Sequence, residues 1–241
     1  MQSTSTNLVT VGGIQVTPFS SMAAAVAHII QADGSVLPGF GIAINPEKVM
    51  LARADDQLKA LINDASLRFP DGTGVVRTMS QKGAPTVRIP GCELWEALMQ
   101  QAATQQLPVV IIGAKPEVNA ACAAKLKAQG TPVVAAIDGY FSDEQQLHDA
   151  LLQHRPKIVT VAMGSPRQEK LIQRLRQVYP DAFYLGVGGT YDVFTGFGKR
   201  APKLFCDLHL EWFYRLCSQP SRLGRQLNLV RYLGLHLRRQ L

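Results

Sequence analysis

The chain has 241 residues, 46% of them apolar, and its 25 Lys and Arg against 18 Asp and Glu give a formal net charge of +7. This length and composition allow a sizeable core, arranged as one large domain or two small ones. Four widely spaced cysteines without a C-x-x-C pair argue against a zinc site or a disulfide framework, and no apolar run approaches the roughly 18–20 residues of a membrane-spanning helix. Because the first basic residue is Lys48, no signal peptide is indicated, and we expect a cytoplasmic protein with reduced thiols.

The net positive charge is concentrated in the last 43 residues. Residues 199–241 carry nine Lys and Arg against two acidic residues, Asp207 and Glu211, whereas the remaining 198 residues are neutral overall. A neutral body with a cationic tail is suited to an anionic surface, which favours peripheral contact with a membrane. The composition changes near Ala201-Pro202, so we expect a body over residues 1–202 and an appendage over residues 203–241.

The first hundred residues indicate an α/β pattern, although a less regular one than the rest of the chain. The expected elements are a helix over 20–31, a short strand over 41–44, one or two helices over 46–65, a tight turn between apolar segments within 68–76, and a helix over 92–105.

Strands and helices alternate regularly from residue 108 onward. Strands are expected over 108–112, 132–137, 158–163 and 182–187, and helices over 117–129, over 143–154 and from Pro166. Strands that alternate with helices of 10–15 residues indicate βαβ units. The predicted fold class is therefore α/β, a Rossmann-like parallel sheet flanked by helices, with a C-terminal basic amphipathic helical appendage.

The appendage is expected to contain two helical stretches around Gln219-Pro220. In the second stretch, apolar side chains share one stripe about 120° wide, with arginines elsewhere on the circumference. The stripe consists of Leu223, Leu227, Val230, Leu233, Leu237 and Leu241. Such a helix either packs its leucines on the body or lies in a membrane interface, and both readings stay open. Nucleic acid is not expected as a partner, because a leucine-rich face has no use on a phosphate backbone.

The glycine-rich turns after the predicted strands indicate a ligand site. They lie at 113–115, 138–140, 164–168 and 188–192, and ligands of open parallel sheets bind at the carboxyl ends of the strands. Two of these turns lead into helix N-termini, which suit phosphate, so a nucleotide or a sugar diphosphate is the expected ligand. The alternative is that each glycine only permits a tight turn.

Several nucleotide and metal motifs are missing from the sequence. The run Gly186-Val-Gly188-Gly189 lacks the dinucleotide spacing and starts no obvious helix, and there is no P-loop and no D-x-D triplet. No metal site and no cofactor are therefore expected, and backbone amides and arginines would meet the charge of a phosphate. Asp71, between apolar residues and glycines, is the best candidate for a partly buried base, although Asp-Gly alone is usually only a turn.

Eight segments carry a resemblance to a known family. They are INPEKVM at 44–50, PDGTGVV at 70–76, RIPG at 88–91, VAMGSPRQE at 161–169, GVGGTYD at 186–192, RAP at 200–202, EWFYRL at 211–216 and QPSRLGR at 219–225. In this order and spacing they make the chain resemble the WecG/TagA/CpsF glycosyltransferase family (glycosyltransferase family 26) over roughly residues 10–240. Within that family it most resembles the members that transfer N-acetyl-D-mannosaminuronic acid from UDP to undecaprenyl-diphospho-N-acetylglucosamine in enterobacterial common antigen biosynthesis.

The resemblance implies an inverting, metal-independent transfer at the cytoplasmic face of the inner membrane. Asp71 matches the family's general base, and Arg215, Arg222 and Arg225 match tail arginines that fold over the site and neutralise diphosphate. Asn45 and Gln168 match residues that hold the sugar or the acceptor, with Arg88 as a further contact. Gly188, Gly189 and Asp192 are expected beside the nucleotide. Many relatives have Thr where this chain has Ala43, which leaves the sugar specificity near that position open.

Two other functions remain as alternatives. The donor could be the neutral UDP-N-acetylmannosamine, as in teichoic acid or capsule synthesis, because a uronate needs an extra cation that the sequence does not single out. Lys115, Arg167 and Arg77 are candidates for that cation, and each also reads as a surface charge. The second alternative is a non-catalytic membrane adaptor that binds a nucleotide without turnover.

Overall fold

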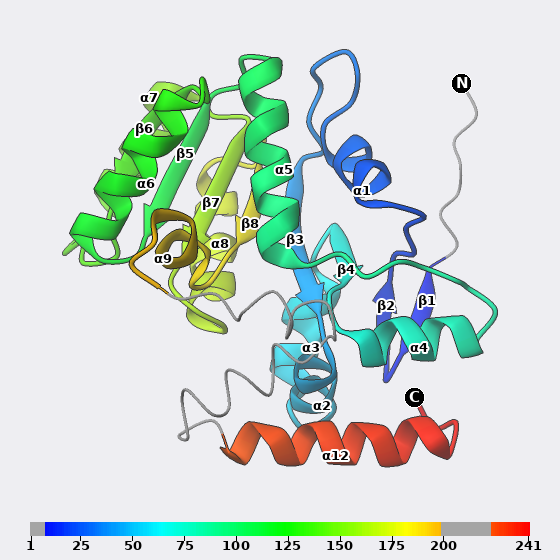
Figure 1. Cartoon of the computed structure of the whole chain (residues 1–241). Helices are drawn as coiled ribbons and strands as arrows, with labels where there is room; N and C mark the ends of the chain where they lie inside the picture. The colour runs from blue at the N-terminus through cyan, green and yellow to red at the C-terminus, as the bar shows by residue number, and fades with distance from the viewer. Residues whose placement is uncertain (1–7, 199–222) are drawn as a thin grey trace.

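The computed structural model describes residues 8–198 and 223–241 and has one central sheet of six parallel strands (Figure 1). The strands lie in the order β4-β3-β8-β7-β5-β6, and every neighbouring pair is parallel. Their bounds are Gly39–Ile44 for β3, Leu67–Pro70 for β4, Val109–Gly113 for β5, Val133–Ile137 for β6, Ile158–Ala162 for β7 and Phe183–Gly186 for β8. The predicted α/β fold with a parallel sheet is confirmed.

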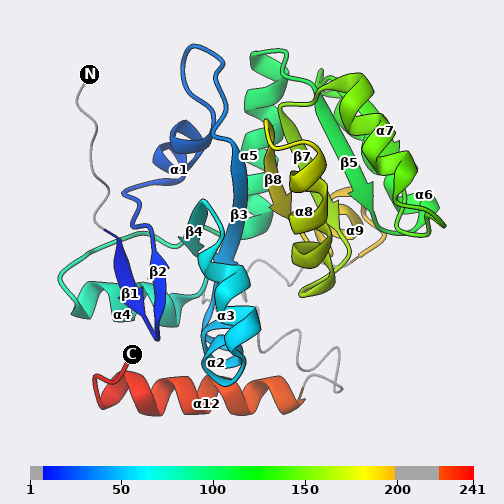
Figure 2. The same cartoon turned by 180° about the vertical axis from the view of Figure 1, so that it is seen from behind.

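Helices cover both faces of this sheet and enclose two separate apolar clusters. On one face lie α1 (Met22–Ile29), α5 (Gly91–Thr104), α6 (Pro116–Ala128) and α9 (Thr190–Thr195). The other cluster includes side chains from α2 (Pro46–Ala54), α3 (Asp56–Asn63), α4 (Thr73–Gln81), α7 (Gln145–His154), α8 (Arg167–Val178) and α12 (Leu223–Leu237). Figures 1 and 2 show α5 in front of the sheet in one view and α8 in front of it in the other. Because both faces are covered, β5 and β7 are continuous buried runs rather than alternating ones.

The segment expected over 46–65 resolves into two helices. They are separated at Asp55, whose carboxylate accepts hydrogen bonds from the backbone N–H groups of Gln57 and Leu58 and thereby caps α3. The segment at 68–76, expected as a turn between apolar stretches, is the strand β4 followed directly by α4. The tight turn is therefore a strand-to-helix connection of the parallel sheet.

A small hairpin before the sheet was not predicted. β1 (Val9–Val11) pairs antiparallel with β2 (Ile14–Val16) through Gly12 and Gly13, both of which have positive φ. Two consecutive residues with positive φ are what a type I′ hairpin turn requires. The buried Arg68 side chain fastens this hairpin to β4 by donating to the backbone carbonyl of Gln15, and it also donates to the carbonyls of Asn63 and Ala65 at the end of α3. The hairpin thereby protects the edge of the sheet at β4.

The last helix, α12, packs on α2 and α4 through a tyrosine-centred contact (Figure 1). Tyr232 is 2% exposed, and its hydroxyl lies 2.8 Å from Thr78 Oγ1, which lies 2.9 Å from His236 Nδ1. Leu235 packs against the same apolar cluster. The body-facing side of α12 is therefore formed around Tyr232 and not around the predicted leucine stripe.

Three of the six side chains in the predicted leucine stripe face away from the body. Val230, Leu233 and Leu237 are 68%, 53% and 72% exposed, whereas Leu241 is buried. The reading in which this stripe packs on the body is therefore wrong for its three central side chains. The side chains of Leu223 and Leu227, and the first predicted helical stretch of the appendage, lie outside the described residues. Within the described ranges, no helix is both long enough and apolar enough to span a bilayer.

The buried tyrosine of α12 predicts a loss of stability at alkaline pH. Burial raises the pKa of Tyr232 to about 12 from 10.0, and the hydrogen bond with Thr78 partly opposes this. The unfolded chain therefore releases this proton near pH 10 while the folded chain keeps it, so the contribution is complete below pH 10 and disappears as the pH rises through about 12. A shift of this size corresponds to about 2–3 kcal/mol.

Urea unfolding at pH 8 to pH 12, for the unmodified protein and for Tyr232→Phe, measures this contribution. The stability advantage of the unmodified protein should shrink across the upper half of that range, because Phe has no proton to release. A constant difference between the two proteins would show that the Tyr232 hydroxyl titrates normally in the folded state.

Candidate functional site

The strand order brings the predicted site residues together at the carboxyl edge of the sheet. Asp71 follows β4, Asn45 follows β3 and Gly188 follows β8, and these three strands are neighbours in that order. Adjacent strands are about 4.8 Å apart, so the three strand ends fall within about 10 Å of one another. Ligands of open parallel sheets bind at this edge.

The turns that carry Asp71 and Asn45 are joined to each other. The backbone N–H groups of Asp71 and Gly72 both donate to the Ile44 carbonyl, at 3.0 and 3.3 Å. A Cβ atom on Gly72 would lie 2.5 Å from Pro46 Cδ and 3.2 Å from the Asn45 Cα, so only glycine fits at this approach. The Asn45 side-chain oxygen accepts from the Lys48 backbone N–H at 2.8 Å and caps α2. This cap fixes the orientation of the Asn45 carboxamide beside Asp71.

Arg88 holds the Asp71 turn from the other side. Its Nε donates to the Asp71 carbonyl oxygen at 2.8 Å and lies 3.9 Å from Asp71 Oδ1. The two side chains are 19% and 27% exposed, so the carboxylate is partly buried as expected and still open to solvent. The Ile89 backbone N–H donates to the Pro70 carbonyl at 2.7 Å, which anchors the segment of Arg88 along the end of β4. A carboxylate in this setting is positioned to accept a proton from a bound hydroxyl group.

Gln168 lies under the turn that follows β8. Its side chain is 5% exposed, and its Oε1 accepts from the Gly188 backbone N–H at 3.0 Å. A Cβ atom on Gly186 would lie 2.4 Å from Gln168 Nε2, so glycine at 186 is what admits this side chain. The structure thus gives Gln168 a contact with the Gly188-Gly189 turn that the sequence did not indicate.

The Gly188-Gly189 turn starts a helix, which corrects one sequence expectation. Helix α9 begins at Thr190, directly after Gly189, and ends at Thr195, where Gly196 with φ of 85° follows as the cap. It has 6 residues, which is too short for a helical period to be visible in the sequence. Tyr191, fully buried, anchors it by a hydrogen bond from its hydroxyl to the Thr160 carbonyl at 3.0 Å. Asp192 is half-buried in the first turn of this helix.

The structure describes only some of the remaining residues that were predicted for the site. Lys115 and Arg167 are exposed at the starts of α6 and α8, on the carboxyl edge, and Arg77 is exposed along α4. Arg215 and Arg222 lie outside the described residues, and Arg225 lies in α12 with a side chain that is not described. In the described parts of the chain, no group of three His, Cys, Asp or Glu side chains is arranged to hold a metal ion.

Two charged residues at this edge were not singled out from the sequence. Lys48 in α2 and Glu169 in α8 form an ion pair of 3.0 Å, with side chains that are 14% and 5% exposed. Both lie in segments that carry the family resemblance, beside Asn45 and Gln168. Only the fold shows that residues 121 positions apart meet here.

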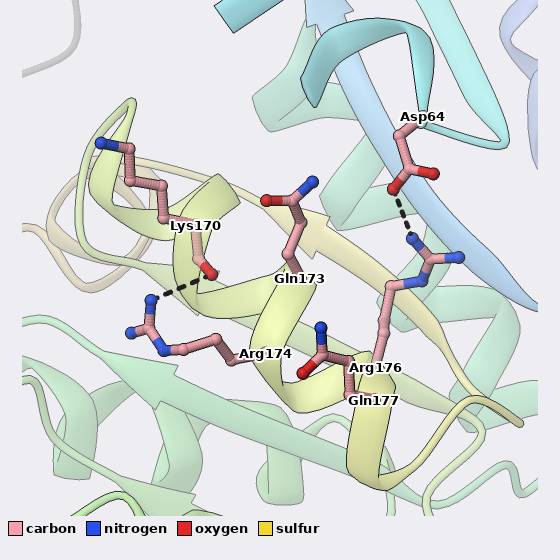
Figure 3. Close-up of a pocket in the computed structure, with 6 residues that line it drawn as sticks. All are labelled: Asp64, Lys170, Gln173, Arg174, Arg176 and Gln177. Carbon is pink, nitrogen blue, oxygen red and sulfur yellow. Dashed lines mark hydrogen bonds and ion pairs between the residues drawn. The ribbon is translucent and has the colours of Figure 1, made fainter. Parts of the chain in front are cut away.

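A surface cavity of about 530 Å³ lies along α8 and shares no lining residue with this cluster (Figure 3). It is lined by Asp64, Lys170, Gln173, Arg174, Arg176 and Gln177. Two of its three cations are ion paired, Arg174 with Glu144 at 2.6 Å and Arg176 with Asp64 at 3.2 Å. Because these charges are already compensated, the carboxyl edge of the sheet is the better candidate for the functional site.

The comparison with protein families gives one match that spans nearly the whole chain. Residues 9–241 match the family described as the Glycosyl transferase WecG/TagA/CpsF family. The matched range includes every predicted site residue and both neighbours Lys48 and Glu169.

Proposed function

The chain belongs to the WecG/TagA/CpsF family of glycosyl transferases, and from this premise we propose which sugar it moves and how. The proposed reaction transfers N-acetyl-D-mannosaminuronic acid from UDP to undecaprenyl-diphospho-N-acetylglucosamine, as in enterobacterial common antigen biosynthesis, with inversion at the anomeric carbon. The observation that carries the mechanism is the junction of the Asp71 and Asn45 turns at adjacent strand ends. The uronate donor and this pathway come from the resemblance of the motifs.

The proposed chemistry is a single displacement. The acceptor sugar hydroxyl attacks the anomeric carbon of the donor while the Asp71 carboxylate takes its proton, and the bond from that carbon to the UDP oxygen breaks. The departing diphosphate gains negative charge, which Arg215, Arg222 and Arg225 would neutralise in this proposal. Arg88 keeps the Asp71 turn in place during the step, through its hydrogen bond of 2.8 Å to the Asp71 carbonyl.

The nucleotide would bind along the remaining strand ends. Gly188, Gly189 and Asp192 stand at the end of β8, next to the Asn45 turn. Tyr140, after β6, is 70% exposed and offers an aromatic face on which a uracil ring could stack. The ends of β8 and β6 are three strand spacings apart, about 14 Å, which a nucleoside diphosphate can span.

The exposed face of α12 supports a membrane surface as partner. Val230, Leu233 and Leu237 project away from the body, and the exposed Arg231 and Arg238 lie beside this stripe on the helical circumference. An apolar stripe with flanking cations is the pattern of helices that lie in a membrane interface. Each basic residue near an anionic leaflet contributes about 1 kcal/mol. This arrangement would place the enzyme on the cytoplasmic face of the inner membrane, where a polyprenyl-linked acceptor is found.

Replacing Leu233 and Leu237 together by Glu is expected to lower binding to vesicles that contain phosphatidylglycerol by at least about 10-fold. The reason is that two exposed apolar side chains leave the lipid contact and two negative charges face an anionic surface. Vesicle co-sedimentation measures the change. Leu152→Glu is the matched control, because Leu152 is a 55% exposed leucine on α7, away from α12. Equal binding by the double variant and the control would contradict a lipid contact at α12.

The experiment that tests the function is a transfer assay with a short-chain lipid diphospho-N-acetylglucosamine in the presence of EDTA. UDP-N-acetylmannosaminuronic acid and UDP-N-acetylmannosamine are offered separately. Product from the uronate donor alone supports the proposal. Product from the neutral donor alone would keep the family and overturn the donor. Binding of UDP without product from either donor would favour the adaptor alternative.

A further inference from the structure

A largely buried ion pair connects two of the helices that start at the candidate site. Lys48 in α2 and Glu169 in α8 meet at 3.0 Å, and their side chains are 14% and 5% exposed. Ion pairs in such surroundings contribute little net stability, because removing both charges from water offsets their attraction. Two apolar side chains in the same place would stabilise the fold equally well. Stability therefore does not explain why this pair is charged, and its geometry has to be considered instead.

The ion pair is part of a continuous path of polar contacts across three strand ends. At one end, the Lys48 backbone N–H donates to Asn45 Oδ1 at 2.8 Å, beside the Asp71 turn. In the middle, Lys48 Nζ and Gln168 Nε2 both approach Glu169 Oε1, at 3.0 and 3.4 Å. At the other end, Gln168 Oε1 accepts from the Gly188 backbone N–H at 3.0 Å. The path therefore runs from the turn of Asp71 and Asn45 to the turn of Gly188 and Gly189.

The middle of this path has little freedom to move. Glu169 Oε2 is buried and has no hydrogen-bond partner among the described residues, so Lys48 supplies the main compensation for that carboxylate. The Gln168 side chain packs directly against Gly186, and a Cβ atom on Gly186 would overlap Gln168 Nε2. A change in either charged residue must therefore displace Gln168, or leave a charge buried without compensation.

We propose that Lys48 and Glu169 are positioning residues of the transfer reaction. Their ion pair sets the separation between the turn that carries the base Asp71 and the turn that faces the nucleotide. This inference depends on the proposed function, in which the acceptor binds at the first turn and the UDP at the second. If the two reacting groups are misplaced by about 1 Å, the rate falls by about 100-fold. An ion pair that fixes the distance between the two turns would therefore keep the rate high.

The test uses Lys48→Met, Glu169→Gln and the double variant in the full-length protein, with the donor that the unmodified enzyme accepts. Each single variant is expected to lower kcat by about 10- to 100-fold, as loss of residues that orient a site commonly does. The affinity for UDP alone should change less than about 3-fold, because the nucleotide contacts only one of the two turns. The double variant should be no slower than the slower single variant, since both changes break the same connection.

A matched control comes from the same helix. Arg174 in α8 forms two hydrogen bonds with Glu144, at 2.9 and 2.6 Å, on the outer surface. Arg174→Met removes an ion pair from α8 without touching the path, so its kcat should stay within about 2-fold of the unmodified enzyme. Glu169→Gln keeps the size of the side chain, and it serves alone if Lys48→Met does not fold. Unchanged kcat in Glu169→Gln, or a loss equal to that of Arg174→Met, would overturn the proposal.

A second measurement separates this inference from the proposed function. Hydrogen exchange with and without UDP reports the amides of residues 44–48 and 186–190 independently of any transfer. In the unmodified protein UDP should protect both segments, and in Lys48→Met only the second. If no donor gives product, the proposed function fails. The exchange measurement still shows whether the ion pair connects the two turns. Protection of both segments in Lys48→Met would show that the ion pair does not connect them.

Discussion

Replacement of Asp71 by Asn is expected to lower kcat for sugar transfer by about 100- to 10,000-fold, the usual contribution of a general base. An amide cannot accept the proton of the attacking hydroxyl, whereas its size and shape match those of the carboxylate. The fold should persist, because the Asp71 backbone N–H keeps its bond to the Ile44 carbonyl and the Asp71 carbonyl keeps the bond from Arg88 Nε, while Asn weakens only the ion pair between the side chain and Arg88. The affinity for UDP should also be unchanged, since the nucleotide leaves from the other side of the reacting carbon.

Asp64→Asn is the matched control for this measurement. Asp64 is a more exposed carboxylate that also pairs with an arginine, Arg176, at 3.2 Å, but it lines the cavity on α8 and not the carboxyl edge. Steady-state kinetics at saturating donor and acceptor, with thermal unfolding of each variant, gives the comparison. A kcat of Asp71→Asn within about 3-fold of the unmodified enzyme would exclude Asp71 as the base.

Replacement of Tyr232 by Ala is expected to lower the free energy of unfolding by about 3–5 kcal/mol and to lower transfer as well. The first effect follows from the cavity that a fully buried ring leaves between α12 and α4. The second follows from position, because the ring lies against the turn of the base: a Cβ atom on Gly74 would lie 3.2 Å from Tyr232 Cε1 and 2.9 Å from Pro46 Cγ. Loss of the ring removes the packing behind both the Asp71 and the Asn45 turns.

Two control substitutions test whether the effects of Tyr232→Ala come from the loss of its buried ring. Tyr232→Phe keeps the ring and removes the hydrogen bond to Thr78, which at neutral pH should cost about 1 kcal/mol and leave transfer nearly intact. Leu233→Ala changes the next side chain, which is 53% exposed, and should leave the free energy of unfolding within about 0.5 kcal/mol. Denaturant unfolding and transfer rates measure all three variants. If Tyr232→Ala kept full activity once folded, α12 would not support the turn of the base.

The parallel sheet could be predicted from the sequence, and so could the edge of the sheet that carries the candidate site. Apolar runs such as Val109–Gly113 and Val133–Ile137, with the single helix α6 between them, leave few arrangements other than βαβ units. Strand ends in such a sheet share one edge, so the glycine-rich turns already indicate in the sequence where a ligand site is expected. The proposal of Asp71 as the base came from the family resemblance, since Asp-Gly by itself reads as a turn.

Other features could not be predicted, because they depend on contacts between distant parts of the chain. The helical period groups Leu233 with Leu237 correctly, but it cannot say whether that side or the side of Tyr232 docks on the body. The docking partner of Tyr232 is Thr78, 154 positions away. The pairing of Lys48 with Glu169 is hidden for the same reason. The hairpin at Gly12-Gly13 is a different case, since a Gly-Gly pair between alternating apolar residues is itself a sequence signal for a hairpin.

The sheet separates the apolar interior into two compartments, and this has a consequence for engineering the enzyme. Leu98 on α5 and Val49 on α2 belong to different clusters on opposite faces, so substitutions at such pairs share no partners and their changes in unfolding free energy should add within about 0.5 kcal/mol. The cluster with α5 and α6 can thus be repacked for thermal tolerance in one library. The cluster with α2, α4 and α12 supports the turns of Asn45 and Asp71. Repacking that cluster for thermal tolerance would therefore also change the turnover rate of the enzyme.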